Sequence, residues 1–91
     1  MAITIRVPNA LRNLTDDQGK LQADGTTVRE VFGSLGERHP GLLERITEED
    51  GELRRFLNVF VNGDDIRFES DLDTRVGDGD EISIVPSIAG G

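Results

Sequence analysis

The 91-residue sequence has no cysteine, tryptophan or tyrosine, and it has a single lysine. Without cysteine the chain has no disulfide bond, no cysteine-ligated zinc and no thiol nucleophile, and this absence fits a cytoplasmic protein. A domain of this size without such cross-links depends on the packing of regular secondary structure. The sequence also lacks a run of about 18 apolar residues and a signal-peptide pattern, so we expect no membrane segment.

Basic residues are few: ten Lys and Arg stand against 18 Asp and Glu, which gives a formal net charge of −8. Nucleic-acid binding requires basic residues gathered into a patch, and here they are spread along the chain. The acidic charge keeps a protein in solution and steers it toward basic partner surfaces. We therefore expect protein partners, with no nucleic acid and no membrane.

Side chains that form catalytic or metal sites are equally sparse. His39, the only histidine, has no serine and base arranged around it, so we predict no catalytic residue. Asp71 and Asp73 begin like a calcium-binding loop, but Arg75 and Val76 interrupt the required ligand pattern. Four phenylalanines alone leave little to line a substrate cavity. The sequence predicts a protein without its own enzyme activity, metal ion or bound cofactor.

The N-terminal part predicts a hairpin. Apolar residues at every second position of residues 2–7 indicate a half-buried strand. Pro8 ends this strand, because proline has no N–H to donate to a ladder. Residues 9–19 carry turn-forming side chains and predict a loop, and residues 20–23 predict a short strand that pairs with the first.

The middle of the chain predicts the main helix. Thr27 and Glu30 have the spacing of a capping box, which pairs free N–H groups at a helix N-terminus. Apolar residues then recur on one helical face: Val28, Val31, Phe32 and Leu35. Gly33 and Gly36 weaken the helix, but their small size lets it lie close to a sheet. Pro40-Gly41 ends the helix, and residues 42–46 predict only a short helical turn.

The C-terminal half predicts three strands. Residues 47–52 form an acidic, solvated loop, and residues 54–62 follow as the strongest strand pattern. Its alternation places Leu57, Val59 and Val61 on one face and Phe56, Asn58, Phe60 and Asn62 on the other. An Asn-Gly turn leads to a short edge strand at residues 65–68. After a tight turn at residues 78–80, residues 81–85 predict the last strand.

The predicted elements form one α+β domain over residues 1–91, with residues 86–91 as a flexible C-terminal tail. A mixed sheet of four to five strands packs on one main helix. If the first and last strands lie side by side and parallel in the middle, joined by a right-handed crossover, the arrangement is a β-grasp. A ferredoxin-like layout stays open at this point, although it requires a second full helix that residues 42–46 are too short to supply.

Phe56, Phe60 and Val85 fall on the strand face that points away from the predicted helix. Aromatic side chains exposed on a sheet face mark interfaces, unless the loop that begins at Thr47 covers the rings. We predict that these three residues, together with Pro86, bind a partner protein.

The chain ends in two glycines, Gly90 and Gly91, preceded by Ile88 and Ala89. Glycine has no Cβ, so this tail can enter a slot too narrow for side chains and present the Gly91 carboxylate there. The dipeptide alone is also compatible with a frayed terminus that has no role.

Several short motifs occur in a fixed order along most of the chain. They are Ala-Asp-Gly-Thr-Thr-Val at residues 23–28, Pro-Gly-Leu at 40–42, Asn-Val-Phe-Val-Asn-Gly at 58–63, and Asp-Gly-Asp-Glu at 78–81 before an apolar strand, a proline and Gly-Gly. Together they resemble the ThiS/MoaD family of ubiquitin-like sulfur carrier proteins. Leu11-Arg12, Arg55-Phe56 and the final Ala-Gly-Gly make the chain most similar to the CysO type within that family.

The resemblance implies a ubiquitin-like β-grasp fold and a carrier function centred on Gly91. In the family, an adenylating partner enzyme uses ATP to convert the terminal carboxylate into an acyl-adenylate, and a sulfur donor then yields a thiocarboxylate. For the CysO type, the resemblance implies sulfur delivery to a cysteine synthase, followed by release of cysteine by a JAMM-type metalloprotease. Phe56, Phe60 and Val85, beside Pro86, are where we expect the adenylating enzyme to dock.

Three other functions stay open from the sequence. The chain can instead be a ubiquitin-like modifier conjugated to lysines through Gly91, or the small subunit of a molybdopterin synthase. It can also be a non-covalent binding module whose Gly-Gly end is incidental. The sequence does not select the pathway that receives the sulfur or the identity of the sulfur donor.

Overall fold

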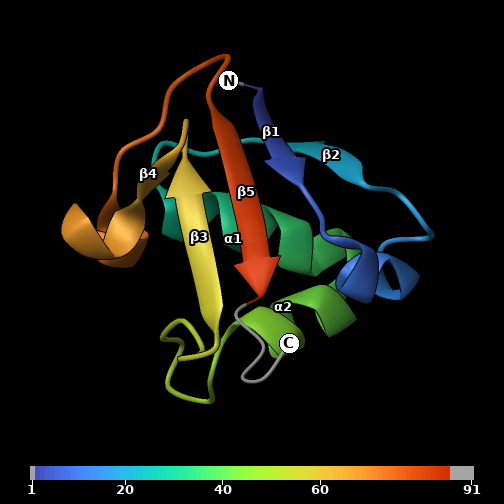
Figure 1. The fold of residues 1–91 in the computed structure, drawn as a ribbon. Helices are drawn as coiled ribbons and strands as arrows, with labels where there is room; N and C mark the ends of the chain where they lie inside the picture. The colour runs from blue at the N-terminus through green and yellow to red at the C-terminus, as the bar shows by residue number, and fades with distance from the viewer. Residues whose placement is uncertain (1, 87–91) are drawn as a thin grey trace.

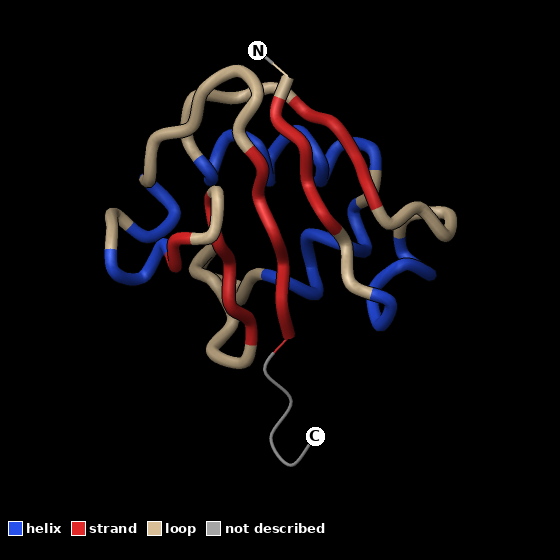
Figure 2. The backbone as a smooth tube through the Cα atoms, turned by 45° about the horizontal axis from the view of Figure 1, so that its top comes forward, coloured by secondary structure: helices blue, strands red, loops and turns tan. Residues whose placement is uncertain are grey.

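The computed structural model describes residues 2–86, which form a five-stranded mixed sheet with two helices packed on one face (Figure 1). The strands lie in the order β2-β1-β5-β3-β4. The helices α1 (Val28–Arg38) and α2 (Pro40–Ile46) lie on the same side of the sheet (Figure 2). Within residues 2–86, the opposite face, here called the outer face, therefore carries no helix. This arrangement confirms the predicted β-grasp and excludes the ferredoxin-like layout.

The strand that ends the described chain, β5 (Glu81–Pro86), lies in the centre of the sheet. It pairs in parallel with β1 (Ile3–Arg6) on one side and antiparallel with β3 (Leu57–Val61) on the other. The antiparallel hairpin of β1 and β2 (Lys20–Ala23) also matches the prediction. The first and last strands are therefore neighbours, as expected, although they stand at opposite ends of the chain.

The core lies between the sheet and the two helices. Inward residues of the three central strands are buried, and the predicted apolar face of α1 packs over them. The fully covered side chains among them are Ile3, Ile5, Val28, Val31, Val59 and Ile82. Burial of one such side chain stabilises the fold by about 1.5–3 kcal/mol, which suits a domain that has no covalent cross-link to rely on.

The N-terminus of α1 is capped at Thr27, as predicted. The Thr27 hydroxyl oxygen accepts a hydrogen bond from the Glu30 backbone N–H at 3.2 Å. The Glu30 carboxylate reaches back one residue further than in a standard capping box, because it accepts from the N–H and the hydroxyl of Thr26 at 2.8 and 2.7 Å. The backbone hydrogen bond from Thr26 is the main reason why the pKa of Glu30 lies below its usual value.

The predicted helical turn at residues 42–46 is part of a longer helix, α2, which begins at Pro40. Pro40 occupies its first turn, where the missing N–H costs no hydrogen bond. His39 joins the two helices: its N–H donates to Leu35 O at 2.7 Å and its carbonyl accepts from Leu42 N at 3.0 Å.

No helix among residues 2–86 is both long and apolar enough to cross a membrane.

The expectation that Gly33 and Gly36 let α1 approach the sheet is wrong. A Cβ at Gly36 would lie 2.5 Å from Leu43 Cδ2, so this glycine makes room for α2. A Cβ at Gly33 would meet no neighbouring atom within 4 Å. The surroundings of the two glycines therefore differ: a side chain at Gly36 would collide with Leu43, whereas a side chain at Gly33 would have free space.

Two predicted segments differ in the structure. Residues 9–19 do not form a plain loop, since Asn9–Leu14 form a 3-10 helix (η1) that buries Leu11. The predicted edge strand at residues 65–68 is also wrong, because β4 contains only Asp64–Asp65 and Ile66–Phe68 form a second 3-10 helix (η2). Asp65 Oδ1 accepts the Arg67 backbone N–H at 2.9 Å, and this capping bond replaces the ladder pairing.

The strongest predicted strand is shorter than its pattern. β3 starts at Leu57 instead of residue 54, because residues 55 and 56 form a turn before it. Within β3 the predicted alternation is confirmed: Leu57, Val59 and Val61 are buried, whereas Asn58 and Phe60 are partly exposed. The Asn62-Gly63 turn also matches, with positive φ at both residues.

Three hydrogen bonds that involve the side chains of Asn62 and Asp80 fix the start of β5. The Asp80 carboxylate accepts from Asn62 Nδ2 at 3.0 Å and from the Gly77 N–H at 2.8 Å. Asn62 Oδ1 in turn accepts from the Glu81 N–H at 3.0 Å. The side-chain bond from Asn62 is the main cause that lowers the pKa of Asp80 from its ordinary value. The turn after β3 and the turn before β5 are thereby tied together.

The contrast between the two helical glycines predicts opposite stability effects of one substitution. Gly33→Ala is expected to raise the free energy of unfolding by about 0.5–1 kcal/mol, because alanine favours helix and has free space here. Gly36→Ala is expected to gain less or to destabilise, because Leu43 must move. Urea unfolding of the two variants measures the difference. An equal gain in both would contradict the close contact between Gly36 and Leu43.

The lowered pKa of Asp80 predicts a pH-dependent contribution to stability. The folded-state pKa lies below 3.8, so the ionised carboxylate stabilises the fold above that pH and the contribution is lost as the pH falls through the folded value. Asp80→Asn is expected to lower the urea midpoint near neutral pH, with the deficit narrowing in acid. Asp64→Asn, at an exposed position of β4, serves as the control. A deficit that is constant with pH would contradict the assignment.

Candidate functional site

The root of the predicted tail lies at the end of the central strand. Pro86 is the last residue of β5 and stands opposite Leu57 in antiparallel register. The sequence predicted that the strand ends at residue 85 and that the tail begins at residue 86. The structure corrects this by one residue, because Pro86 belongs to the sheet. At this position proline has no N–H to donate to the ladder. Ile88, Ala89, Gly90 and Gly91 lie outside the described residues.

The outer face beside this root is apolar in the middle. Val85 and Phe60 both point to it, because their inward neighbours in β5 and β3 are buried. The Val85 residue is 43% exposed, and Phe60 is partly exposed. Val85 stands opposite Asn58 and Ser83 opposite Phe60, so small and amide side chains separate the two apolar ones. The parity that predicted this face is confirmed.

Phe56 extends the apolar surface from outside the sheet. It lies in the turn before β3, one residue before the partner of Pro86, and is 66% exposed. The loop that starts at Thr47 leaves this ring accessible, which settles the alternative in favour of an exposed aromatic. The strand pattern was therefore right about the exposure of Phe56 and wrong about its place in the ladder.

Phe68 is an exposed aromatic that the sequence pattern did not single out. It ends η2 and is 87% exposed. Its charged neighbours Arg67 and Glu69 gave no usable signal, since Ile66 also lies between two charged residues and is buried. It belongs to η2, which follows the edge strand β4, whereas the other site residues lie in or just before β3 and in β5.

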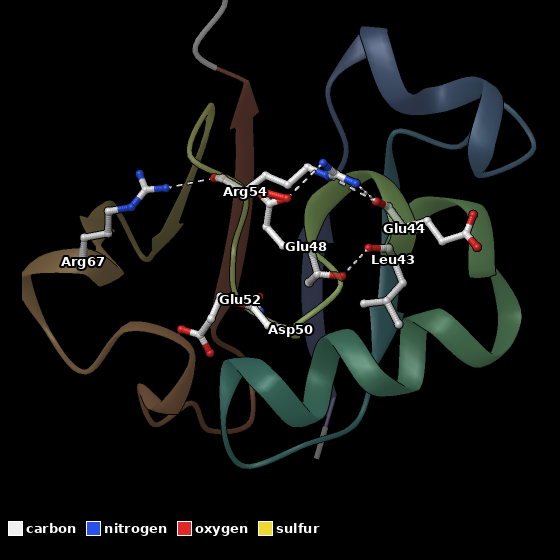
Figure 3. A network of polar contacts seen from close by, with 8 residues as sticks. Leu43, Glu44, Glu48, Asp50, Glu52, Arg54 and Arg67 are labelled. Carbon is white, nitrogen blue, oxygen red and sulfur yellow. Dashed lines mark hydrogen bonds and ion pairs between the residues drawn. The ribbon is translucent and has the colours of Figure 1, made fainter.

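Two arginines hold the segment that leads into β3 (Figure 3). Arg54 Nε and Nη2 donate to the Glu44 carbonyl oxygen at 3.2 and 2.9 Å, near the C-terminus of α2. Its Nη1 lies 3.4 Å from Glu48 Oε1. Arg67 Nη2 donates to the Arg54 carbonyl oxygen at 3.1 Å, and its Nη1 donates to Asn58 Oδ1 at 2.8 Å.

This network positions Phe56. The chain is held on both sides of the turn: before it, Arg54 bonds to the Glu44 carbonyl oxygen, and after it, Asn58 accepts a bond from Arg67. Bonds from a guanidinium to carbonyl oxygens at a helix end are favourable both as hydrogen bonds and with the helix dipole. Sequence reasoning missed the network, because the arginines are distant in sequence from their acceptors and no local pattern connects them.

The other candidate groups do not gather into a site. Asp71 and Asp73 lie in the 3-10 helix η3 (Asp71–Asp73), and Asp73 Oδ1 lies 3.2 Å from Arg29 Nε. Within residues 2–86 no cluster of three or more His, Asp or Glu side chains is placed to hold a metal ion. His39 connects the helices and lies on their side of the sheet. The described features that converge are the outer face and the root of the tail.

Comparison with known proteins agrees with this geometry. The family model for the ThiS family matches residues 5–91. The sulfur carrier protein CysO of Mycobacterium tuberculosis is 38% identical, and the alignment covers 100% of both chains. A putative sulfur carrier protein of Archaeoglobus fulgidus is 41% identical with the same coverage.

A solved structure is also similar over the whole fold. The crystal structure of the Amycolatopsis orientalis BexX/CysO complex contains a chain that matches with a TM-score of 0.93 and 40% identity, covering 99% of this chain and 100% of that one. The likeness in sequence and in fold extends over nearly all of both chains. These findings confirm the predicted sulfur-carrier role and the ubiquitin-like β-grasp, and the chain belongs to the ThiS family.

Proposed function

We propose that this chain carries sulfur as a thiocarboxylate on Gly91 and presents it to enzymes that dock on the outer face. The observation that supports this most strongly is the position of β5. Its end, Pro86, lies beside Phe56 and Val85, and the chain continues from there for five residues to a Gly-Gly end. A partner bound to the outer face therefore has the tail within reach.

The chemistry needs activation, because a carboxylate is a poor electrophile with its charge delocalised over two oxygens. An adenylating partner lets a Gly91 carboxylate oxygen attack the α-phosphorus of ATP, which releases pyrophosphate and forms an acyl-adenylate. A sulfide or persulfide sulfur then attacks the carbonyl carbon and AMP leaves. With a persulfide, a reductant of the thiol class cleaves the S–S bond to release the thiocarboxylate. The ATP binds to the partner, and this chain supplies the carboxylate as co-substrate.

The carrier itself needs no catalytic side chain in this scheme. Its contribution is binding energy and position, which can account for a large part of a rate enhancement when they hold a reacting group in place. The rigid sheet and the Arg54 and Arg67 network supply the position, and the two glycines allow the last residues to enter a narrow active site.

We further propose that the sulfur passes to a biosynthetic acceptor enzyme of the cytoplasm. Two findings support this proposal. A relative over the full chain is named sulfur carrier protein CysO, and a similar chain was solved in a complex of BexX with CysO. By this analogy the acceptor is a cysteine synthase that uses a serine-derived substrate, and a JAMM-type metalloprotease then releases cysteine from Gly91. Conjugation to lysines through Gly91 stays the alternative, and the small archaeal modifier protein 3 of Haloferax volcanii is 38% identical over 68 residues, 75% of this chain.

The proposed thiocarboxylate predicts a change in mass that depends on Gly91. Incubation of the full chain with its adenylating enzyme, ATP and sulfide is expected to add about 16 Da, because one carboxylate oxygen is replaced by sulfur. Deletion of Gly91, or addition of one alanine after it, is expected to abolish the gain and leave urea unfolding unchanged. Intact-mass spectrometry reads both results.

The control is the same reaction without ATP, which should leave the mass of the chain unchanged. A gain that persists without Gly91 would place the sulfur elsewhere and contradict the proposal. Gly-Gly remnants on lysines of other proteins, without any thiocarboxylate on the carrier, would favour the modifier function instead.

The exposed ring of Phe56 predicts a binding defect without a folding defect. Phe56→Ser is expected to raise the Kd for the adenylating enzyme by roughly tenfold or more, since an aromatic anchor at an interface commonly contributes about 2 kcal/mol. Phe60→Ala is expected to weaken binding more than it lowers stability. Phe68→Ser, at a ring that is also exposed and lies in η2 after the edge strand β4, is the control. Equal effects of Phe56→Ser and Phe68→Ser on the Kd would contradict the assigned face.

A further inference from the structure

The charged side chains on the outer face near the tail include several cations, whereas the molecule as a whole is acidic. The net charge of −8 predicts a partner with a basic surface. Yet two cationic side chains, Arg6 and Lys20, stand on the outer face on one side of β5, and the guanidinium of Arg67 lies against Asn58 on the other side. Arg55 is exposed in the turn beside Phe56.

Arg6 and Lys20 are directly opposite each other in the antiparallel ladder of β1 and β2. Their side chains share the outer face, because side chains alternate along a strand and the adjacent residues Ile5 and Leu21 point into the core. Like charges at such positions destabilise a sheet, so the pair works against the fold. Departures from local rules of this kind are expected where a residue serves function.

Compensation within the described residues is incomplete. Glu81 Oε1 lies 2.8 Å from Arg6 Nε and balances that arginine. Within residues 2–86, neither Lys20 nor Arg55 forms an ion pair. Arg67 uses its guanidinium on a neutral amide and a carbonyl oxygen, so its positive charge is also uncompensated by a carboxylate contact.

Within β5 and the turn before it, the carboxylates lie at the start of the strand, whereas Glu48 and Glu52 of the loop before β3 lie beside Arg54 and Arg29. Asp78 and Asp80 precede the strand and Glu81 begins it, whereas the cations flank Ser83 and Val85 toward its end. Asp65, opposite Phe60 in β4, is the carboxylate that comes nearest to the apolar centre by register. The outer face is therefore electrically polar along β5, acidic at the start and basic toward Pro86.

We propose that the adenylating partner receives the tail through a surface with an apolar centre and carboxylates around it, which pair with Lys20, Arg55 and Arg67. This inference rests on the proposed function and adds the sign of the partner's surface, opposite to the sign expected from the net charge. Charges at the rim of an interface act mainly on association rate and on its salt dependence. The basic end of the face orients the encounter so that the tail arrives first.

The experiment measures the association rate constant of the full chain with its adenylating enzyme at several salt concentrations. Lys20→Glu and Arg55→Glu are compared with Glu69→Lys, which reverses one charge of an exposed residue beyond β4. We expect each of the first two variants to slow association by about tenfold at low salt, with the loss shrinking as salt screens the charges. Glu69→Lys is expected to leave the rate nearly unchanged.

Faster association of Lys20→Glu and Arg55→Glu would mean a basic partner surface and would overturn the inference. An unchanged rate would also overturn it and would leave Lys20 as a charge that blocks edge-to-edge pairing of β2. The +16 Da assay, run at saturating enzyme, separates this outcome from failure of the proposed function, since about 16 Da is gained through Gly91 chemistry whatever the rim charges. Circular dichroism checks that the variants fold.

Discussion

The parallel pairing of β1 with β5 is the constraint on which the rest of the molecule depends. It places the last strand in the middle of the sheet, where neighbours on both sides hold it. Residues 82 and 83 of β5 pair on both sides, and the ladder with β3 continues alone to Pro86, which therefore has a defined position opposite Leu57. The proposed reactive group, the Gly91 carboxylate, follows five residues after this point.

The same pairing explains why the carrier can be so small. The two helices cover one face of the sheet and bury an apolar core, which leaves the outer face free for binding. The turns that frame β5 are tied by Asn62 and Asp80 at its start, and the segment opposite its end is held by Arg54 and Arg67. Rigidity at both ends of one strand is what a protein that acts by positioning requires.

Much of this fold follows from the sequence because local patterns and tertiary packing agree. Alternation in β3 and β5 and the 3.6-residue period of α1 each identified buried positions correctly, since one face of each element meets the core. Two segments were predicted wrongly because short 3-10 helices form there. Ile66 is buried and was assigned to a strand, but the Asp65 side chain caps a 3-10 turn there. Residues 9–14 likewise adopt a 3-10 helix, for which a single sequence carries little signal.

The site divides in the same way. The exposure of the apolar part of the outer face was predictable from parity, whereas the role of Gly91 rests on the resemblance to sulfur carriers and stays a prediction. The network of Arg54 and Arg67 and the opposed pair of Arg6 and Lys20 were not, because they depend on which strands become neighbours. Charge shows the difference most clearly: the total charge is a property of composition, whereas a partner meets only the charges on one face.

The claim that Gly91 is the reacting group is tested most directly by ATP–pyrophosphate exchange with the purified adenylating enzyme. The full chain is compared with a semisynthetic chain whose Gly91 ends in a carboxamide, which keeps the size of the end and removes its charge and nucleophilic oxygen. The account predicts exchange that depends on the chain with the free carboxylate and none with the carboxamide. Equal exchange with both chains would contradict it, because the activated group would then lie elsewhere.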